Sequence, residues 1–359
     1  MKQLVFNVAA NCSLFLIFCG LGGLILEGSI RVLFPIFDPS GRVEYQCTDG
    51  VHRGPENINL RQYTNTGEYD YRVAFNQYGF RDSKDLAQSS NEDIFVVGDS
   101  FSIGQGVEKQ YRYSDILDKT LPTNVLNISS PNNLNGYYWL LKYAESKGAS
   151  IKNIIVGICM ENDLEQYSVE IGKCTETPPV SWKSLLPGQN NLNLQQIKKT
   201  LLKYSATYSL ITSIAHQHNS LRNLAIRLGF IYKNDVFPYS LSQFNENVLQ
   251  SSANRVADLV HNYNALILVI PSRGLWQGNN REESRKIHDH FISLLNEQQL
   301  DVIDLKHAFE QSGNPLSFHY RKEGHWNAKG HHRAAEEIQS FLKHSTLFGA
   351  IPQESLNLP

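Results

Sequence analysis

The sequence predicts an α/β protein of three layers, in which helices cover both faces of a five-stranded parallel sheet. The first indication is a set of five short apolar runs rich in β-branched residues, which is typical of strands buried on both faces. The second is the helical pattern between successive runs, because strands that alternate with helices form parallel sheets. The third observation is an apolar stretch near the N-terminus that is long enough to cross a membrane ahead of this domain.

The predicted elements follow directly from these runs. The strands are expected at residues 94–97, 125–128, 154–158, 265–270 and 302–305. The helices between and after them are expected at 113–121, 136–147, 242–263, 281–298 and 332–341. Because each strand is apolar over nearly its whole length, both faces of the sheet must be buried, and these helices can pack on them.

The chain is expected to contain four regions. They are a membrane anchor in 1–34, a lead-in of short strands and loops in 35–91, the α/β domain in 92–345 and a tail in 346–359. The stretch from about 165 to 262 is too long for one crossover and predicts a helical insertion. Its prolines and asparagines at 178–193 mark loops, and 196–229 is helical in pattern. The insertion either covers a substrate site or only packs on the edge of the domain.

The N-terminal stretch from Leu4 to Leu26 contains no charged residue. As a helix it would span about 34 Å, against a hydrocarbon thickness of ~30 Å. A cleaved signal peptide and a soluble core helix are the alternatives, but no small-residue cleavage site follows the stretch. Lys2 precedes it, whereas Glu27 and Arg31 nearly cancel after it. We therefore expect a single-pass membrane protein whose catalytic domain is periplasmic or extracellular.

Composition excludes several classes of function. Lys and Arg total 33 against 35 for Asp and Glu, giving a net charge of -2, so no basic excess exists for binding nucleic acid. The five cysteines form no metal-ligand spacing, although Cys47 and Cys174 lie in polar loops and could pair. No phosphate-binding pattern follows a strand, and His331 and His332 are adjacent and point apart on a helix. We expect neither a cofactor nor a metal.

Polar motifs follow the ends of the predicted strands, where ligands bind in open parallel sheets. Gly98-Asp99-Ser100 follows the first strand, Glu161-Asn162-Asp163 the third, and residues 323–327 precede the last helix. Each motif alone has an ordinary reading as a helix cap. Together they supply a hydroxyl nucleophile, an imidazole with an acidic partner and an amide donor, which is a set suited to acyl transfer.

These motifs resemble the blocks of the SGNH/GDSL hydrolases. Gly98-Asp99-Ser100 is similar to the block with the nucleophilic serine, and Asn162-Asp163 to the block whose Asn donates to the oxyanion. Residues 323–327 resemble the last block, with His325 as base and Glu323 as its acid. Residues 76–82 look like the lead-in of membrane-anchored bacterial members. The resemblance covers roughly 92–341 and implies a flavodoxin-like SGNH hydrolase fold.

Two positions depart from the family pattern. The usual acid is an Asp, whereas this chain has Glu323 two residues before the histidine. The second block offers Ser129 and Asn132 where glycines are expected, and a backbone N–H survives that exchange. The resemblance therefore implies an oxyanion hole made by the N–H groups of Ser100 and Asn132 and the side chain of Asn162.

The expected reaction is hydrolysis of an O-acyl ester, such as an O-acetyl ester, through an acyl-enzyme at Ser100. If a sugar hydroxyl replaces water, the same residues make an O-acyltransferase that modifies a cell-surface glycan. A catalytically silent relative would use the same cleft to bind a glycan. Trp326 is a candidate pocket wall, and Arg273 either faces the same mouth or has an ordinary surface role.

Overall fold

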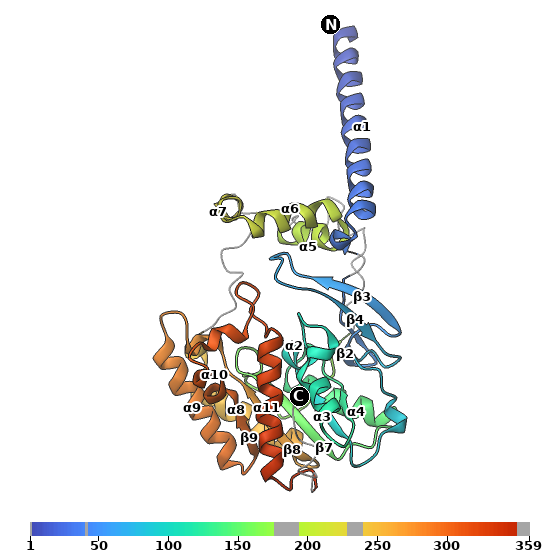
Figure 1. The fold of residues 1–359 in the computed structure, drawn as a ribbon. Helices are drawn as coiled ribbons and strands as arrows, with labels where there is room; N and C mark the ends of the chain where they lie inside the picture. Colours follow the sequence, from blue (N-terminus) through green and yellow to red (C-terminus); the bar gives the residue numbers. More distant parts are fainter. Residues whose placement is uncertain (1, 40–41, 176–193, 228–239, 350–359) are drawn as a thin grey trace. The chain divides into compact units, whose positions relative to one another are not determined.

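The computed structural model describes residues 2–39, 42–175, 194–227 and 240–349 (Figure 1), so the loops predicted at 178–193 lie outside the described residues. The chain divides into two compact units. The first comprises residues 1–42, 61–67 and 179–231, and the second comprises 43–60, 68–178 and 232–359. The second unit holds the sheet and all three motifs.

A five-stranded parallel sheet forms the centre of the second unit. Its strands lie in the order β6-β5-β7-β8-β9, which is the flavodoxin-like order with the first strand of the sheet placed second. Their bounds are β5 Ile94–Val97, β6 Val125–Asn127, β7 Asn153–Cys159, β8 Asn264–Ile270 and β9 Asp301–Asp304. All five predicted strands are confirmed, and their ends differ from the expected ones by one residue at most.

Helices cover both faces of this sheet. One face is packed by α4 (Leu134–Ser146), α8 (Glu246–Val260) and α9 (Arg281–Glu297). The other is packed by α3 (Tyr113–Thr120), α10 (Leu305–Gln311) and α11 (Ala328–His344). The three-layer prediction is therefore confirmed; α10 was not predicted. Helix α8 falls within the stretch predicted as an insertion, yet it packs on the sheet.

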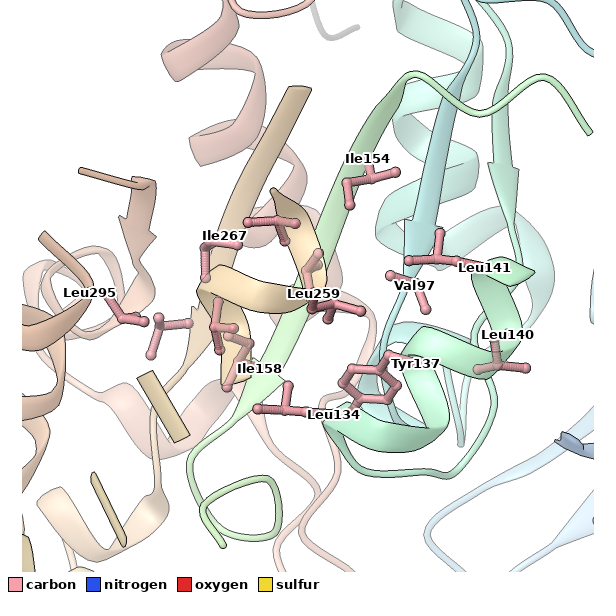
Figure 2. Packing of buried hydrophobic residues seen from close by; sticks show 14 of the residues in the cluster. Val97, Leu134, Tyr137, Leu140, Leu141, Ile154, Ile158, Leu259, Ile267 and Leu295 are labelled. Carbon is pink, nitrogen blue, oxygen red and sulfur yellow. The ribbon is translucent and has the colours of Figure 1, made fainter. Parts of the chain in front are cut away.

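The alternation of side chains along each strand produces two separate apolar clusters. In β5, Phe95 and Val97 enter one cluster, whereas Ile94 and Val96 enter the other. Figure 2 shows the first cluster, where Tyr137 of α4 and Leu259 of α8 meet strand residues. Full burial of one such aliphatic side chain contributes about 1.5–3 kcal/mol, so this packing holds the strand ends in fixed positions.

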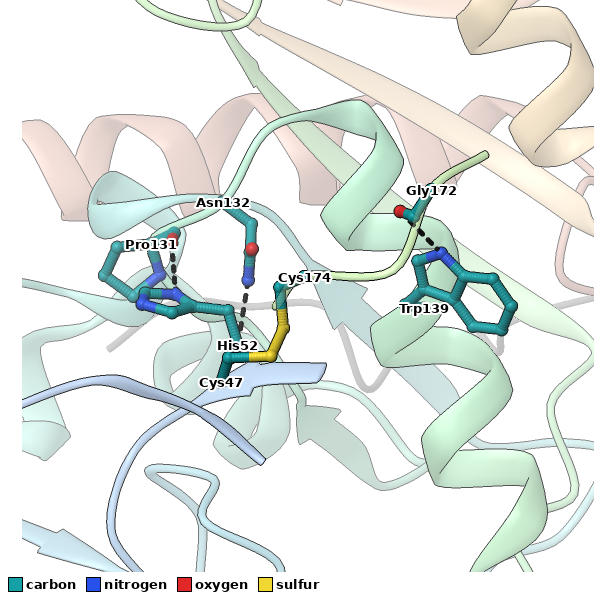
Figure 3. The surroundings of a disulfide bond; sticks show 7 residues. All are labelled: Cys47, His52, Pro131, Asn132, Trp139, Gly172 and Cys174. Atoms are coloured by element: carbon teal, nitrogen blue, oxygen red, sulfur yellow. Dashed lines mark hydrogen bonds between the residues drawn. A yellow bond between two sulfur atoms is a disulfide. The ribbon is translucent and has the colours of Figure 1, made fainter. Parts of the chain in front are cut away.

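The predicted lead-in contains short strands. They are β1 (Gln46–Thr48), β2 (Val51–Arg53), β3 (Ile58–Tyr63) and β4 (Asp70–Phe75). Cys47 of β1 forms a disulfide with Cys174, which follows β7 in the chain (Figure 3). Nearby, Trp139 Nε1 donates to the Gly172 carbonyl at 3.0 Å. The segment that follows Asn162 is thus tied to both β1 and α4.

The first unit contains α1 (Lys2–Leu33), α5 (Leu194–Tyr204), α6 (Ala206–Gln217) and α7 (Asn219–Arg227). Within α1, the 23 residues of Asn11–Leu33 have a mean hydropathy of 1.9, and only 6% of the most apolar window is buried. By length and composition this helix fits a single-pass membrane anchor or a signal sequence.

Candidate active site

The structure brings Ser100, His325 and Glu323 together. The Nε2 atom of His325 lies 2.7 Å from Ser100 Oγ, and Nδ1 lies 2.8 Å from Glu323 Oε1. These are hydrogen-bond distances, so the three side chains form one continuous chain of polar contacts. The side chains of His325 and Glu323 are almost fully buried. Ser100 and His325 are 225 positions apart in the sequence. They meet because both lie at the edge of the sheet where the strands end.

Ser100 is held at a sharp bend between β5 and the short helix α2 (Ser100–Ile103). Asp99 is the N-cap of this helix, and its carboxylate accepts a hydrogen bond from the Phe101 N–H at 2.9 Å. At Gly98 a Cβ atom would collide with Ser102 Oγ, so the bend requires glycine there. The Gly-Asp-Ser motif therefore has both a capping role and a role in presenting the Ser100 hydroxyl.

The loop that carries Glu323 and His325 is fixed from both sides. The Tyr320 N–H donates to the His325 carbonyl at 2.8 Å, and Asn327 caps helix α11. Between the two predicted catalytic residues, Gly324 has a φ of +96°, a conformation that side chains rarely allow. In this geometry His325 contacts Ser100, and Glu323 contacts the other ring nitrogen of His325.

Glu323 has polar neighbours that the sequence did not point to. Tyr69 Oη donates to Glu323 Oε1 at 3.2 Å, and Gln105 Nε2 donates to the same oxygen at 3.1 Å. Burial alone would raise the pKa of Glu323, but the hydrogen bonds and charge of His325 and the bond from Tyr69 hold it below its usual value. Glu323 is therefore the carboxylate form at neutral pH. Tyr69 and Gln105 belong to none of the motifs.

Asn162 lies in the turn after β7 and lines the same pocket as Ser100. Its amide donates to Asp99 Oδ2 at 3.0 Å, and this donor contact also orients the N-cap of α2. Asp163 points away into the core, where it accepts hydrogen bonds from Tyr137 Oη at 3.0 Å and from the Cys159 N–H at 2.7 Å. Burial raises the pKa of both Asp99 and Asp163. Asp163 thus holds the turn that presents Asn162.

Asn132 is not brought into this group. Its side chain donates to the His52 carbonyl at 2.9 Å, beside the Cys47–Cys174 disulfide (Figure 3). Among the described residues that line the pocket at Ser100, Asn132 is not included. The oxyanion role of its N–H stays a prediction.

The pocket at Ser100 is small, with a volume of about 20 Å³. It is lined by Ser100, Phe101, Cys159, Glu161, Asn162, Arg273, Gly324 and His325. The surface role considered for Arg273 is wrong, because its buried guanidinium forms an ion pair with Glu161 at 3.0 Å. The expectation for Trp326 is also wrong: it is fully buried behind Phe101, at 5.3 Å between ring centroids, and does not line this pocket.

Part of the chain is similar to a known family. Residues 243–358, about a third of the chain, match the family model of the SGNH hydrolase-like domain of the acetyltransferase AlgX. A comparison with curated proteins found no match.

Several solved structures are similar at low identity. One is a member of the lipolytic protein G-D-S-L family from Veillonella parvula DSM 2008, with 13% identity, 69% of this chain and 96% of that chain covered, and a TM-score of 0.34. A putative lipolytic protein of the G-D-S-L family from Desulfitobacterium hafniense DCB-2 has 11% identity, coverage of 69% and 98%, and a TM-score of 0.34. The lipase Lip_vut3 from a goat rumen metagenome has 13% identity, coverage of 69% and 96%, and a TM-score of 0.35. These TM-scores are too low to support an argument.

The family match includes the block around His325, and the hydrogen bond between His325 and Ser100 joins that block to the Gly-Asp-Ser turn. Over residues 243–358 the chain is similar to the SGNH hydrolases.

Proposed function

We propose that the protein is a serine-dependent hydrolase of a short O-acyl ester and forms an acyl-enzyme at Ser100. The observation that carries this proposal is the contact between Ser100 Oγ and His325 Nε2 at 2.7 Å, with Glu323 on the other ring nitrogen. A nucleophile, a base and a group that orients the base are then in hydrogen-bond reach of one another.

The chemistry follows from the tautomer that Glu323 favours. A carboxylate at Nδ1 keeps a proton on that nitrogen, so Nε2 accepts the proton of the Ser100 hydroxyl as Oγ attacks the ester carbonyl. The bond between Oγ and the acyl carbon forms, the ester C–O bond breaks, and the proton passes from His325 to the departing alcohol. Water then attacks the acyl-enzyme by the same path in reverse, which releases the carboxylic acid and restores Ser100.

The oxyanion of the tetrahedral intermediate needs hydrogen-bond donors. We assign the Ser100 N–H, the Asn132 N–H and the amide of Asn162 to this role. Asn162 lines the pocket and has two N–H bonds, of which one donates to Asp99. Loss of one such donor typically costs about 3 kcal/mol of transition-state stabilisation.

The size of the pocket supports a small acyl group. A volume of about 20 Å³, with Phe101 and Cys159 in its wall, leaves little room beside Ser100. We propose an O-acetyl ester as the substrate and expect turnover to fall as the acyl chain lengthens.

An O-acyltransferase is the second candidate. Its support is the family model, whose description names an acetyltransferase, and an N-terminal helix that fits a membrane anchor. A sugar hydroxyl of a surface glycan would then take the place of water. On this reading the catalytic domain is periplasmic or extracellular. A silent glycan binder would use the same cleft without an activated serine.

The test uses the full chain in detergent with p-nitrophenyl acetate and longer p-nitrophenyl esters, with and without added oligosaccharides. Ser100→Ala should lower kcat by about 10⁴-fold or more. Ser102→Ala is the matched control, because it removes a buried serine hydroxyl two residues away that contacts Tyr113 instead of His325. It should retain activity.

Each result separates the candidates. An acylated oligosaccharide that forms only with Ser100 present would establish the transferase. Undiminished turnover in Ser100→Ala would refute the proposed nucleophile. Absence of turnover together with no labelling of Ser100 by a fluorophosphonate would leave the silent binder.

A further inference from the structure

Helices α5, α6 and α7 of the first unit, here called the surface helices, expose apolar side chains at helical spacing. On α5 the exposed residues recur three and four positions apart, and on α6 and α7 three apart, so each helix presents an apolar stripe. These side chains are Ile197, Leu201, Tyr204, Ile211, Ile214, Leu221 and Leu224. The largest exposed fractions among the aliphatic ones are 58% for Ile211 and 52% for Leu224. Clustered apolar exposure of this kind marks an interaction surface.

Burial on α6 is the reverse of that in a helix of a water-soluble domain. Ala206, Ser209, Thr212 and Ser213 are buried, while Ile211 and Ile214 are exposed. The buried side is a polar one: Ser213 Oγ donates to Asn65 Oδ1 at 3.2 Å within the same unit. A helix that buries its small polar side chains and exposes its large apolar ones requires an apolar environment outside the protein.

The charge of this segment indicates what that environment is. Residues 194–227 contain five Lys or Arg residues and no Asp or Glu, in a chain whose net charge is -2. The basic residues are Lys198, Lys199, Lys203, Arg222 and Arg227. Helices that combine an apolar stripe with basic residues alone are typical of the interface of an anionic lipid bilayer.

The start of α6 is fixed to α1 at the point where its charge-free stretch ends. Glu27, the first charged residue after Leu26, accepts hydrogen bonds from the N–H groups of Ala206 at 2.7 Å and Thr207 at 3.0 Å. Arg31, one turn further on, donates to the Tyr204 carbonyl at 2.6 Å. Figure 1 shows α5 and α6 beside the C-terminal end of α1, and α6 packs against α1, α5 and α7.

We infer that the surface helices lie in the headgroup region of the membrane that α1 crosses. Their exposed apolar side chains enter the boundary of the acyl chains, and their basic side chains meet the phosphates of anionic phospholipids. A helix that crosses a bilayer over residues 4–26 places Glu27 at the edge of the hydrocarbon, which is the depth at which α6 begins. This inference depends on α1 as a membrane anchor and is independent of the ester chemistry proposed for Ser100.

The test measures the depth of single labelled positions in the full chain. Exposed Cys12 and Cys19 are replaced by Ser, which leaves buried Cys159 and the Cys47–Cys174 disulfide. Ile211→Cys or Leu224→Cys is then introduced and labelled with an environment-sensitive fluorophore. The protein is reconstituted in vesicles of equal parts phosphatidylglycerol and phosphatidylcholine that carry nitroxide lipids. We expect a blue-shifted emission and strong nitroxide quenching at both positions.

Two further positions serve as references. Leu21→Cys, within α1, should report quenching by nitroxides placed deep in the acyl chains. Asn296→Cys, exposed on α9 of the second unit, should report water. In vesicles of phosphatidylcholine alone, quenching at 224 should weaken, because the anionic headgroups are absent.

The outcomes that overturn the inference are distinct. Labels at 211 and 224 that behave like the label at 296, while the label at 21 is quenched, would show an anchored protein whose surface helices are in water. A blue shift without lipid quenching would show that another protein or a second copy covers them. A label at position 21 that is not quenched by the deep nitroxides would show that α1 does not cross the bilayer. Equal quenching in vesicles of phosphatidylcholine alone would show that the surface helices do not depend on anionic phospholipids for binding. None of these results bears on turnover by Ser100.

Discussion

The guanidinium of Arg273 occupies the space that a Cβ atom on residue 324 would need. Arg273 is buried and held by the carboxylate of Glu161, which immediately precedes Asn162. The ion pair therefore joins the segments that follow β7 and β8, next to the loop that carries His325. Gly324 lies between Glu323 and His325, and its lack of a side chain lets the guanidinium of Arg273 approach the backbone of that loop. Arg273 is a positioning residue in this arrangement.

Replacement of Gly324 by Ala should separate activity from stability. The new methyl group must displace Arg273 or the loop, and a displacement of about 1 Å at a catalytic group can cost about 100-fold in rate. We expect kcat for p-nitrophenyl acetate to fall by about that factor. The measurement is steady-state kinetics on variants whose folding is checked by circular dichroism.

Gly313→Ala is the matched control. Gly313 also has a positive φ, of +74°, but nothing lies within 4 Å of its added Cβ. It should lose about 1 kcal/mol of stability through backbone strain and keep its kcat. If both variants lost activity equally, strain in the backbone rather than the contact with Arg273 would be the cause.

The partners of Glu323 predict a graded series of variants. Glu323→Gln removes the charge that stabilises the protonated imidazole and favours the wrong tautomer, so kcat should fall by about 10⁴-fold with little change in KM. Tyr69→Phe removes one hydrogen bond of 3.2 Å from the same carboxylate and should cost about 1 kcal/mol, or roughly fivefold in kcat. Equal losses in the two variants would mean that Tyr69 touches the reacting atoms itself, contrary to the geometry.

The Cys47–Cys174 disulfide should contribute substantially to stability. It closes a loop of 127 residues, and the chain-entropy estimate for such a loop is about 4–5 kcal/mol as an upper value. Reduction should lower the midpoint of urea unfolding, and the double variant Cys47→Ser/Cys174→Ser should have the same low midpoint with or without reductant. A wild-type midpoint that reductant does not change would contradict this prediction.

The sequence predicts most of the sheet and much of the site, because both leave local signals. A strand buried on both faces must be apolar throughout, so runs such as that of β8 are visible without knowledge of their neighbours. Ser100, Asn162 and His325 are found for a similar reason, since each belongs to a short motif next to a strand end or a helix start. Their convergence is then a consequence of parallel strand order.

The supporting residues leave no such signal. Tyr69 contacts Glu323 across 254 positions of sequence, and a single tyrosine in a polar segment looks like any other. The sequence leaves open whether Arg273 faces the site or the surface, because its partner Glu161 lies 112 positions away. Trp326 neighbours His325 in the chain, but sequence adjacency does not reveal which of the two side chains turns into the core.

A buried histidine near the site predicts a specific dependence of stability on pH. His331 of α11 stacks on Tyr113 at 6.1 Å and meets Trp326 edge-to-face at 5.6 Å between ring centroids. Burial, together with the charge of Arg112, lowers the pKa of His331 to about 3. The unfolded chain binds a proton at this residue near pH 6.5, so it holds more protons than the folded chain between pH 6.5 and 3. Stability must therefore fall as pH falls through this range.

Replacement of His331 by Phe, whose ring cannot bind a proton, should reduce this loss of stability at low pH. Between pH 7 and 5, His331 accounts for up to about 2 kcal/mol of the decrease in the free energy of unfolding, and His331→Phe should lack this part. The measurement is urea unfolding of the full chain at the two pH values. His332→Phe is the matched control, because the neighbouring His332 is half exposed and faces Glu336 instead of the core. Its decrease should equal that of wild type. An unchanged decrease in His331→Phe would show that His331 titrates alike in the folded and unfolded chain, and that burial does not keep it neutral.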